Sequence, residues 1–302
     1  MVRSGRAGAP LVEVAPAKIN LTLVVHGRRS DGYHQLESLV AFAGAPASDT
    51  LELAPGGPFR LELSGAAAIA LADDTPQSNL VARAAAAVLR EAPLAETGTF
   101  RLRKYLPVAA GIGGGSADAA ATLRLLRRSN PDLADKVDWQ GLAATIGADV
   151  PVCYESRASL MWGLGTCVAP LPDFPSVWAV LANPGTPLST ADVFRALSAA
   201  AVRQGDSLEA RPVVPQFPGL SALIDFAAGM TNHLELPAKC LCPAIAEALS
   251  LLNGLDGCLL ARMSGSGPTC FALFANAEAA GEGARWLAAN RPSWWVRATA
   301  LH

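Results

Sequence analysis

The sequence predicts an α+β protein of two domains, and three observations lead to this prediction. Its 302 residues are enough for two domains, each with its own core. A glycine-rich stretch at residues 111–116 lies between a predicted strand and an alanine-rich helix. Residues 243–298 follow the order helix, strand, strand, helix, strand, which favours an antiparallel sheet with helices on one face. We place the boundary in a proline-rich segment, giving domains of residues 1–170 and 171–302.

In the first domain, six segments have the apolar pattern and the flanking turn residues of strands. They are residues 11–14, 17–25, 34–42, 50–54, 59–63 and 97–104. Asp31-Gly32 is typical of a hairpin turn, and we expect the strands at 50–54 and 59–63 to form a pair. Helices are predicted at residues 78–90, with Ser78 as N-cap, from the glycine stretch to Arg128, and at residues 139–146.

In the second domain, residues 177–182 are a predicted strand and residues 190–198 a predicted helix. The remaining elements give the order stated above. They are the helix 243–253, the strands 258–263 and 270–274, the helix 277–289 and the strand 294–298.

Composition excludes several classes of protein. Hydrophobic residues make up 51% of the chain and charged residues 17%, which is too apolar for intrinsic disorder. The net charge of -2 leaves no basic excess for nucleic acid. No window has the roughly 20 apolar residues of a membrane span, and the opening residues lack the apolar core of a signal peptide. Six cysteines are too few for a disulfide scaffold, so we expect reduced thiols and a cytoplasmic location.

The stretch Gly111–Ser116 has the properties of a phosphate-binding loop. Four of its six residues are glycine, Pro107 precedes it and a helix follows. Glycine allows positive φ and a close approach of the backbone to a ligand. The free N–H groups at the start of the following helix attract an anion. A phosphate chain is therefore the expected ligand.

Two other loop types do not fit. A Walker A loop ends in Gly-Lys-Ser/Thr, whereas Gly115 is followed by Ser116-Ala117. A dinucleotide fingerprint needs a third glycine where Ser116 stands, and it needs an opening βαβ unit. Three roles remain open for Ser116: capping the helix, contacting a phosphate oxygen, or lying near a magnesium ion.

Several motifs together resemble one family. Residues 107–117 resemble the phosphate-binding motif of the GHMP small-molecule kinases. Residues 15–21 and 27–34 are similar to the opening of the family branch that acts on 4-diphosphocytidyl-2-C-methyl-D-erythritol. Residues 147–151 resemble its catalytic stretch, and residues 263–267 resemble the third glycine motif of the family. The similarity runs from about residue 13 to the C-terminus.

The resemblance implies a two-domain kinase, with a mixed α/β N-terminal domain and a ferredoxin-like antiparallel sheet with helices in the C-terminal domain. It implies ATP-dependent phosphorylation of the 2-hydroxyl of that cytidine diphosphate substrate, a step of non-mevalonate isoprenoid synthesis. It assigns catalysis to Lys18 and Asp149, with the aspartate as the base. It assigns ATP binding to Pro107, Val108, Ala109, Ala110, Gly111, Ile112, Gly113, Gly114, Gly115, Ser116 and Ala117.

The resemblance also assigns substrate contacts to Asn20, Tyr33, His34 and Thr190, of which Tyr33 and His34 recognise the cytidine. A ring pair of this kind can stack on a base and bind its edge. Taken singly, these residues have plainer interpretations. A lysine on a strand is most often solvated. Asp149 alone fits a turn residue or a helix cap, and His34 fits a structural role at a strand edge.

Three further points complete the expectation. His233 stands where these kinases usually carry aspartate in an Asn-Asp-Leu-Glu motif, and the position serves either ATP or a structural bond. Residues 265–267 form either a plain bend or a second backbone wall beside the phosphates or the glycine loop. We expect Mg²⁺ to be held mainly by the phosphates, with no protein ligand assigned, and the oligomeric state stays open.

Overall fold

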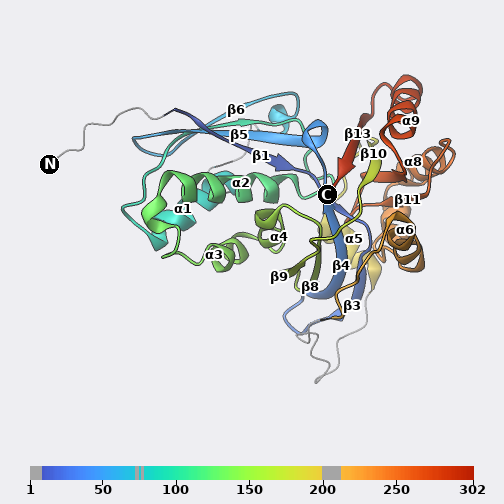
Figure 1. Ribbon diagram of the computed structural model, residues 1–302, viewed down its shortest axis with the longest axis horizontal. Helices are drawn as coiled ribbons and strands as arrows, with labels where there is room; N and C mark the ends of the chain where they lie inside the picture. The colour runs from blue at the N-terminus through green and yellow to red at the C-terminus, as the bar shows by residue number, and fades with distance from the viewer. Residues whose placement is uncertain (1–8, 72–74, 76–77, 199–211) are drawn as a thin grey trace. The chain divides into compact units, whose positions relative to one another are not determined.

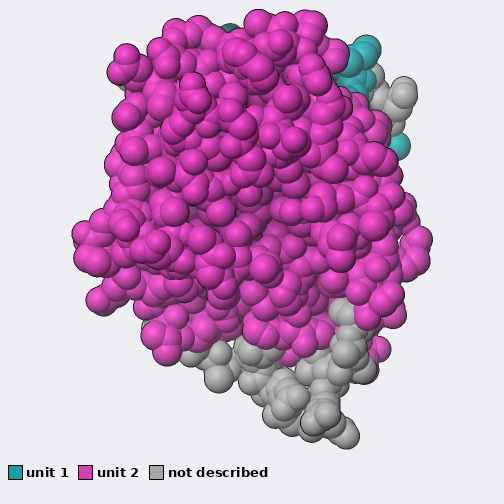
Figure 2. All heavy atoms as spheres, turned by 90° about the vertical axis from the view of Figure 1, so that its right-hand side faces the viewer, with its two compact units in different colours: residues 1–16, 48–108, 114–155 teal, residues 17–47, 109–113, 156–302 magenta. Residues whose placement is uncertain are grey.

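The computed structural model describes residues 9–71, 75, 78–198 and 212–302. The chain forms two compact units, coloured separately in Figure 2. Unit 1 comprises Met1–Pro16, Ser48–Val108 and Gly114–Glu155, and unit 2 comprises Ala17–Ala47, Ala109–Gly113 and Ser156–His302. The chain therefore passes into unit 2 and back again within the glycine loop.

Unit 1 contains a four-stranded sheet in the order β1-β5-β7-β6. Alternate residues of its central strands, such as Leu51, Leu53 and Phe100, are buried. On the other face Arg101 of β7 forms ion pairs with its register partners Glu52 and Glu62. The strands are β1 (Leu11–Pro16), β5 (Ser48–Pro55), β6 (Arg60–Ser64) and β7 (Gly98–Arg103).

Helices cover one face of this sheet (Figure 1). α2 packs on β1 and β5 and runs beside α1, and the buried faces of both helices are rich in alanine, which allows close packing. Arg124 of α2 holds α4 through the Cys153 carbonyl at 2.9 Å. The helices are α1 (Leu80–Glu91), α2 (Gly114–Ser129), α3 (Trp139–Ile146) and α4 (Val150–Glu155).

Unit 2 contains two antiparallel sheets. The first has the order β2-β4-β8-β9, and β3 pairs with β4 as well. In β4 the residues from Leu39 to Phe42 are all buried, as expected for a central strand. The strands are β2 (Lys18–Asn20), β3 (Val24–Arg28), β4 (His34–Phe42), β8 (Ser159–Gly163) and β9 (Cys167–Pro170).

The second sheet has the order β11-β12-β10-β13. α8 (Ala244–Asn253) packs on β11 and β12, while α9 (Ala277–Asn290) packs on β10, β12 and β13. The strands are β10 (Val177–Asn183), β11 (Leu260–Met263), β12 (Cys270–Phe274) and β13 (Trp295–Leu301). Unit 2 also contains α5 (Thr190–Leu197), α6 (Leu220–Gly229) and α7 (Glu235–Leu241). This is the predicted antiparallel sheet with helices.

The predicted pairing of the strands at 50–54 and 59–63 is wrong. β7 lies between them, antiparallel to β5 and parallel to β6. The connecting loop closes around the start of β7 instead of forming a tight turn. Gly56 N–H donates to the Thr97 carbonyl at 2.8 Å, and the Thr97 hydroxyl donates to the Gly57 carbonyl at 3.2 Å.

Two other details differ from prediction, and a third decides one of the roles left open for Ser116. The single strand expected at 17–25 is divided into β2 and β3, because Leu23 N–H donates to the Thr231 carbonyl rather than to a strand partner. Asn79, not Ser78, caps α1, and its Oδ1 accepts from Val81 N–H at 2.9 Å. Ser116 is not an N-cap, since α2 begins at Gly114 and Ser116 lies in its first turn.

In the part of the chain that the structure describes, no helix combines the length and the apolar character needed to cross a membrane.

Candidate active site

The glycine loop comprises residues 107–117. Its middle, residues 109–113, is part of unit 2. Gly111 and Gly113 adopt φ values of 72° and 63°, the left-handed region that glycine enters without strain. A Cβ atom at Gly111 would lie 2.6 Å from both Gly267 N and the Ser264 carbonyl oxygen. Glycine is therefore required at 111 for two reasons, its backbone conformation and the approach of a second segment.

That second segment is the third glycine motif, Met263–Gly267. The Ser264 hydroxyl donates to the Gly111 carbonyl at 3.1 Å, and Thr269 N–H donates to the Ala110 carbonyl at 3.2 Å. Asn232 fixes the motif by donating from Nδ2 to the carbonyls of Met263 and Gly265, both at 2.8 Å. The motif is a backbone wall beside the glycine loop, which decides against the plain bend.

β2 places Lys18 and Asn20 next to this loop within unit 2. Lys18 N–H donates to the Ile112 carbonyl at 2.8 Å, and Asn20 N–H donates to the hydroxyl of Ser264, whose other partner is Gly111. Lys18 is only 4% exposed, so the solvated interpretation of this lysine is wrong. Both residues lie within the hydrogen-bonded network that shapes the loop.

The Asn20 side chain is half satisfied. Its Nδ2 donates to the Ser38 hydroxyl at 2.7 Å, whereas no donor of the described residues reaches the buried Oδ1. A buried acceptor without a partner destabilises a protein by about 1–3 kcal/mol unless a ligand or water supplies a donor. Asn20 Oδ1 is therefore able to accept one further hydrogen bond.

Tyr33 and His34 follow the Asp31-Gly32 turn at the start of β4. The Tyr33 side chain is 65% exposed. The His34 ring stacks on Phe194 of α5, with a centroid distance of 4.8 Å and an angle of 30° between the planes. Burial, followed by the charge of Arg28, lowers the pKa of His34, so the ring is neutral at pH 7. The structure thus adds a third ring to the predicted pair.

Thr190 is the first residue of α5, one turn before Phe194. Its hydroxyl lies 2.7 Å from the Ser266 hydroxyl of the third glycine motif. Asn20 and Thr190 thus bond to the third glycine motif. His34, next to Tyr33, contacts the same helix that carries Thr190.

Unit 1 carries both ends of the glycine loop, Pro107 and Val108 before it and Gly114–Ala117 after it. A buried ion triad of Lys104, Asp49 and Asp118 lies close to these ends. Lys104 Nζ is 2.5 Å from Asp49 Oδ2 and 2.6 Å from Asp118 Oδ2. The Oδ1 atom of Asp49 also accepts from the backbone N–H of Tyr105 and Leu106. The triad therefore joins the residues before the loop to the first turns of α2.

The charges of the triad do not balance, because two carboxylates share one ammonium group. Burial raises the pKa of Asp118 to about 7. The charge of Lys104 lowers this pKa in part, and the charge of Asp49 raises it further. The two aspartates, in contrast, raise the pKa of Lys104 above its usual value despite burial. Lys104 therefore stays charged, and Asp118 is the member that takes up a proton near neutrality.

Asp149 is also in unit 1, directly before α4. Gly147 ends α3 by donating its N–H to the Ala143 carbonyl, and Cys153 N–H donates to the Asp149 carbonyl. Two short helices thus hold Asp149 at a tight corner. The proposed catalytic pair is distributed over both units, with Lys18 in unit 2.

His233 makes a structural bond. The ring atom Nδ1 accepts from the backbone N–H of Val25 in β3 at 3.1 Å. The backbone N–H of His233 donates to the Leu23 carbonyl at 2.9 Å. A carboxylate oxygen at this position would accept the same bond. The position was expected to serve either ATP or a structural bond, and unit 2 contains the structural bond.

Sequence reasoning missed Phe194 and the ion triad. It singled out the motifs that contain Ser264 and Asn232 but gave neither residue a role. Phe194 has no local signal, since its partner His34 is far away in the sequence. Lys104 had one signal, because lysine occurs at only four positions of the chain.

Comparisons with known proteins agree with these motifs. The family model for the N terminal domain of GHMP kinases matches residues 79–157, and the model for their C terminal domain matches residues 209–290. A 4-diphosphocytidyl-2-C-methyl-D-erythritol kinase from Methylorubrum extorquens (strain PA1) is 49% identical over 290 residues, 95% of this chain and 97% of the relative. A relative of the same name from a Bradyrhizobium species (strain BTAi1) is 46% identical, with 100% of both chains covered.

Solved structures of kinases also resemble this chain. A crystal structure of 4-(cytidine 5'-diphospho)-2C-methyl-D-erythritol kinase has a TM-score of 0.73 at 32% identity, covering 96% of this chain and 99% of that one. Homoserine kinase from Cytophaga hutchinsonii has a TM-score of 0.64 at 16% identity, covering 99% of this chain and 97% of that chain. At this identity the likeness shows a shared fold alone. The chain belongs to the GHMP kinase family, in the branch of the 4-diphosphocytidyl-2-C-methyl-D-erythritol kinases.

Proposed function

We propose that this protein transfers the γ-phosphoryl group of ATP to the 2-hydroxyl of 4-diphosphocytidyl-2-C-methyl-D-erythritol, a step of non-mevalonate isoprenoid synthesis. ATP is the phosphoryl donor of GHMP kinases generally. The observation that carries the choice of substrate is the ring cluster of unit 2. Exposed Tyr33 stands next to His34, which stacks on Phe194. Homoserine and mevalonate have no aromatic ring that would use such a cluster.

Phosphate binding is supported by the loop residues. Positive φ at Gly111 and Gly113 turns the backbone of the loop, and Gly115 at the start of α2 is exposed. The first N–H groups of this 16-residue helix have no partner within the helix, so they attract anionic oxygens. We assign the phosphates of ATP to residues 107–117 on this basis, with Mg²⁺ held mainly by the phosphates themselves.

The proposed roles of the catalytic residues follow from phosphoryl-transfer chemistry. Asp149 accepts the proton of the substrate hydroxyl as that oxygen attacks phosphorus. Lys18 stabilises the negative charge that spreads over the phosphoryl oxygens. Asn20, with its unpaired Oδ1, and Thr190 orient the substrate. The cytidine lies against Tyr33 and His34, with the neutral imidazole bonded to the edge of the base.

Two other expectations stay predictions. One is the domain boundary after residue 170, and the family-model matches lie on either side of it. The other is the cytoplasmic location.

The experiment is a steady-state assay of ADP release. ADP should appear when ATP and the cytidine diphosphate substrate are both present, and CDP should compete with that substrate. Mevalonate and homoserine serve as matched alternative acceptors. Turnover of either one without competition by CDP would leave the kinase class standing and overturn the substrate.

A further inference from the structure

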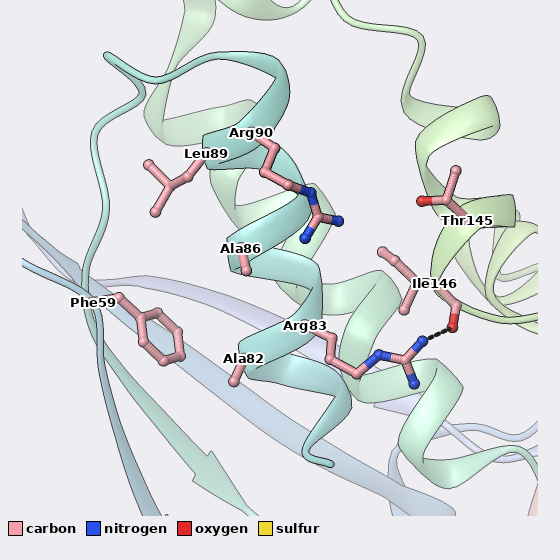
Figure 3. A pocket seen from close by; sticks show the side chains of 8 residues that line it. All are labelled: Phe59, Ala82, Arg83, Ala86, Leu89, Arg90, Thr145 and Ile146. Atoms are coloured by element: carbon pink, nitrogen blue, oxygen red, sulfur yellow. Dashed lines mark hydrogen bonds between the residues drawn. The ribbon is translucent and has the colours of Figure 1, made fainter. Parts of the chain in front are cut away.

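A pocket of about 420 Å³ lies on unit 1, and none of the residues assigned above lines it (Figure 3). It is formed by α1, the end of α3 and the loop that leads into β6. Its lining residues are Phe59, Ala82, Arg83, Ala86, Leu89, Arg90, Thr145 and Ile146. Pockets for small ligands usually measure about 300–1,000 Å³, so this one has room for a small molecule.

The two sides of the pocket differ in chemistry. Figure 3 shows Phe59 and Leu89 on one side of α1 and the guanidinium groups of Arg83 and Arg90 toward Ile146 on the other. Helical spacing explains the separation, because residues 82, 86 and 89 form one stripe and residues 83 and 90 form the next. A bound molecule would meet an apolar surface at one end and two cations at the other.

No carboxylate lines the pocket to neutralise these cations. Arg90 forms no ion pair or hydrogen bond among the described residues. Arg83 uses only Nη2, which donates to the Ile146 carbonyl at 2.8 Å, so its other N–H groups remain available. Two guanidinium groups suit a doubly charged head better than a single charge, and their planar forks match the oxygens of a phosphate.

We propose that this pocket binds a small phosphate monoester with a hydrocarbon chain. The phosphate lies between Arg83 and Arg90, and the chain extends over Ala86 toward Leu89 and Phe59. The pocket shares no residue with the proposed sites for ATP and the cytidine substrate.

The position of Arg83 gives this site a consequence for catalysis, which rests on the proposed function. Ile146 is the last residue of α3, and Asp149 follows directly after Gly147 and Ala148. A phosphate that binds the remaining N–H groups of Arg83 draws the guanidinium group away from the Ile146 carbonyl. The end of α3 then loses a hydrogen bond, and the corner that holds the proposed base loosens.

Calorimetric titration with hexyl phosphate tests the site. A non-hydrolysable ATP analogue is present throughout to fill the nucleotide site. We expect one molecule to bind, at least tenfold more tightly than inorganic phosphate, and 1-hexanol to show no binding. Arg90→Gln should weaken binding at least fivefold and Ala86→Glu should abolish it. Arg90→Lys should retain part of it, and Arg127→Gln on α2, outside the pocket, should change nothing.

The proposal is overturned if hexyl phosphate does not bind, if Arg90→Gln and Ala86→Glu bind it normally, or if it binds only in titrations from which the ATP analogue is left out. The catalytic consequence has its own readout, the kcat of ADP release with and without hexyl phosphate. We expect at least a twofold decrease in wild type and none in Arg90→Gln. An unchanged kcat with hexyl phosphate bound overturns the link to Asp149. Absence of wild-type turnover without hexyl phosphate would instead count against the proposed function.

Discussion

The surroundings of His34 set both its orientation and its pKa. Stacking on Phe194 fixes the plane of the imidazole, and burial followed by Arg28 lowers its pKa. A neutral imidazole has one donor and one acceptor nitrogen, which suits the mixed edge of a pyrimidine base. The same contact with Phe194 also gives His34 a structural role, so the two interpretations are compatible.

His34→Ala should raise the KM for the cytidine substrate more than the KM for ATP. A lost hydrogen bond costs about 0.5–1.5 kcal/mol, which corresponds to roughly 2–12-fold in affinity. Steady-state kinetics with each substrate varied in turn measure the two effects. His26→Ala, on the neighbouring strand β3, is the matched control and should change neither value. Equal changes for both substrates would place His34 outside the cytidine site.

Gly111→Ala should impair ATP binding and destabilise the protein together. The new Cβ would lie 2.6 Å from backbone atoms of Gly267 and Ser264, and φ at this position is 72°. Backbone atoms cannot move aside as a flexible side chain would, and positive φ strains alanine. Gly281→Ala is the control, because a Cβ there meets no atom within 4 Å. Thermal unfolding and ATP titration should show a loss for Gly111→Ala alone; wild-type values would contradict the wall contact.

At the scale of elements, the ion triad connects three parts of unit 1. Asp49 comes from β5, Lys104 directly follows β7, and Asp118 comes from α2. Asp49 also binds the backbone before the loop, and a Cβ at Gly114 would lie 3.2 Å from Lys104 Nζ. The triad therefore sets the spacing between β7 and the start of α2, the two ends that the glycine loop joins.

The triad also predicts a dependence of stability on pH. Asp118 has a pKa near 3.9 when unfolded and about 7 when folded, so the folded state binds more protons between these values. Stability from this group is complete below about pH 4 and is lost as pH rises through 7. From pH 5 to pH 8, wild type should lose on the order of 2 kcal/mol relative to Asp118→Asn, which cannot titrate.

Urea unfolding at several pH values measures this difference. Asp173→Asn, at an exposed position, controls for the loss of a charge and should keep the pH dependence of wild type. Parallel curves for wild type and Asp118→Asn would show that Asp118 does not titrate in this range.

Elements with a local signal were predictable, and those that depend on distant partners were not. The bounds of His34–Phe42, Trp139–Ile146 and Cys270–Phe274 agree with the predicted ones. The pairing of β5 with β7 instead of β6 depends on Thr97 entering the loop at Gly56 and Gly57. Nothing in the alternation of those strands specifies that contact. α4 was not predicted, although Pro151 is compatible with a helix because proline is tolerated in the first helical turn.

The candidate site follows the same division. Lys18, Asp149 and the glycine loop came from spelled motifs that a resemblance could match. Phe194 and the triad came from contacts between elements, which become visible only when the chain is folded. Motif spelling therefore finds the residues proposed to act on a ligand, and the structure adds the residues that contact the loop or the proposed ring cluster.

At the scale of the whole molecule, the proposed chemistry draws on both compact units. Unit 2 provides Lys18, Asn20, the ring cluster and residues 109–113 of the glycine loop, while unit 1 provides the ends of the loop and Asp149. Neither unit alone contains both members of the proposed catalytic pair. Kinetics can test their joint action directly, because a shared transition state makes the effects of two residues depend on each other.

Asp149→Asn should keep its packing, since the two side chains are nearly isosteric, but the amide cannot accept the proton of the hydroxyl. A general base contributes typically ~10²–10⁴-fold, so kcat should decrease by that order while substrate affinity changes little. Single-turnover and steady-state measurements separate chemistry from binding. Near-normal turnover would show that proton removal is not the role of Asp149. A dissociative transition state needs little help from a base, and in that case Asp149 positions the hydroxyl.

Lys18→Met keeps most of the side-chain stem and removes the charge, so its effect should also fall mainly on kcat. If Lys18 and Asp149 act on the same transition state, the double variant Lys18→Met/Asp149→Asn should be less impaired than the product of the two single effects. Once one member of an interdependent pair is gone, the other has less left to stabilise. Lys136→Met, at an exposed position, is the control for removal of a lysine charge. A double variant whose kcat equals the product of the single effects would mean that the two residues act independently, and the proposed catalytic pair would have to be given up.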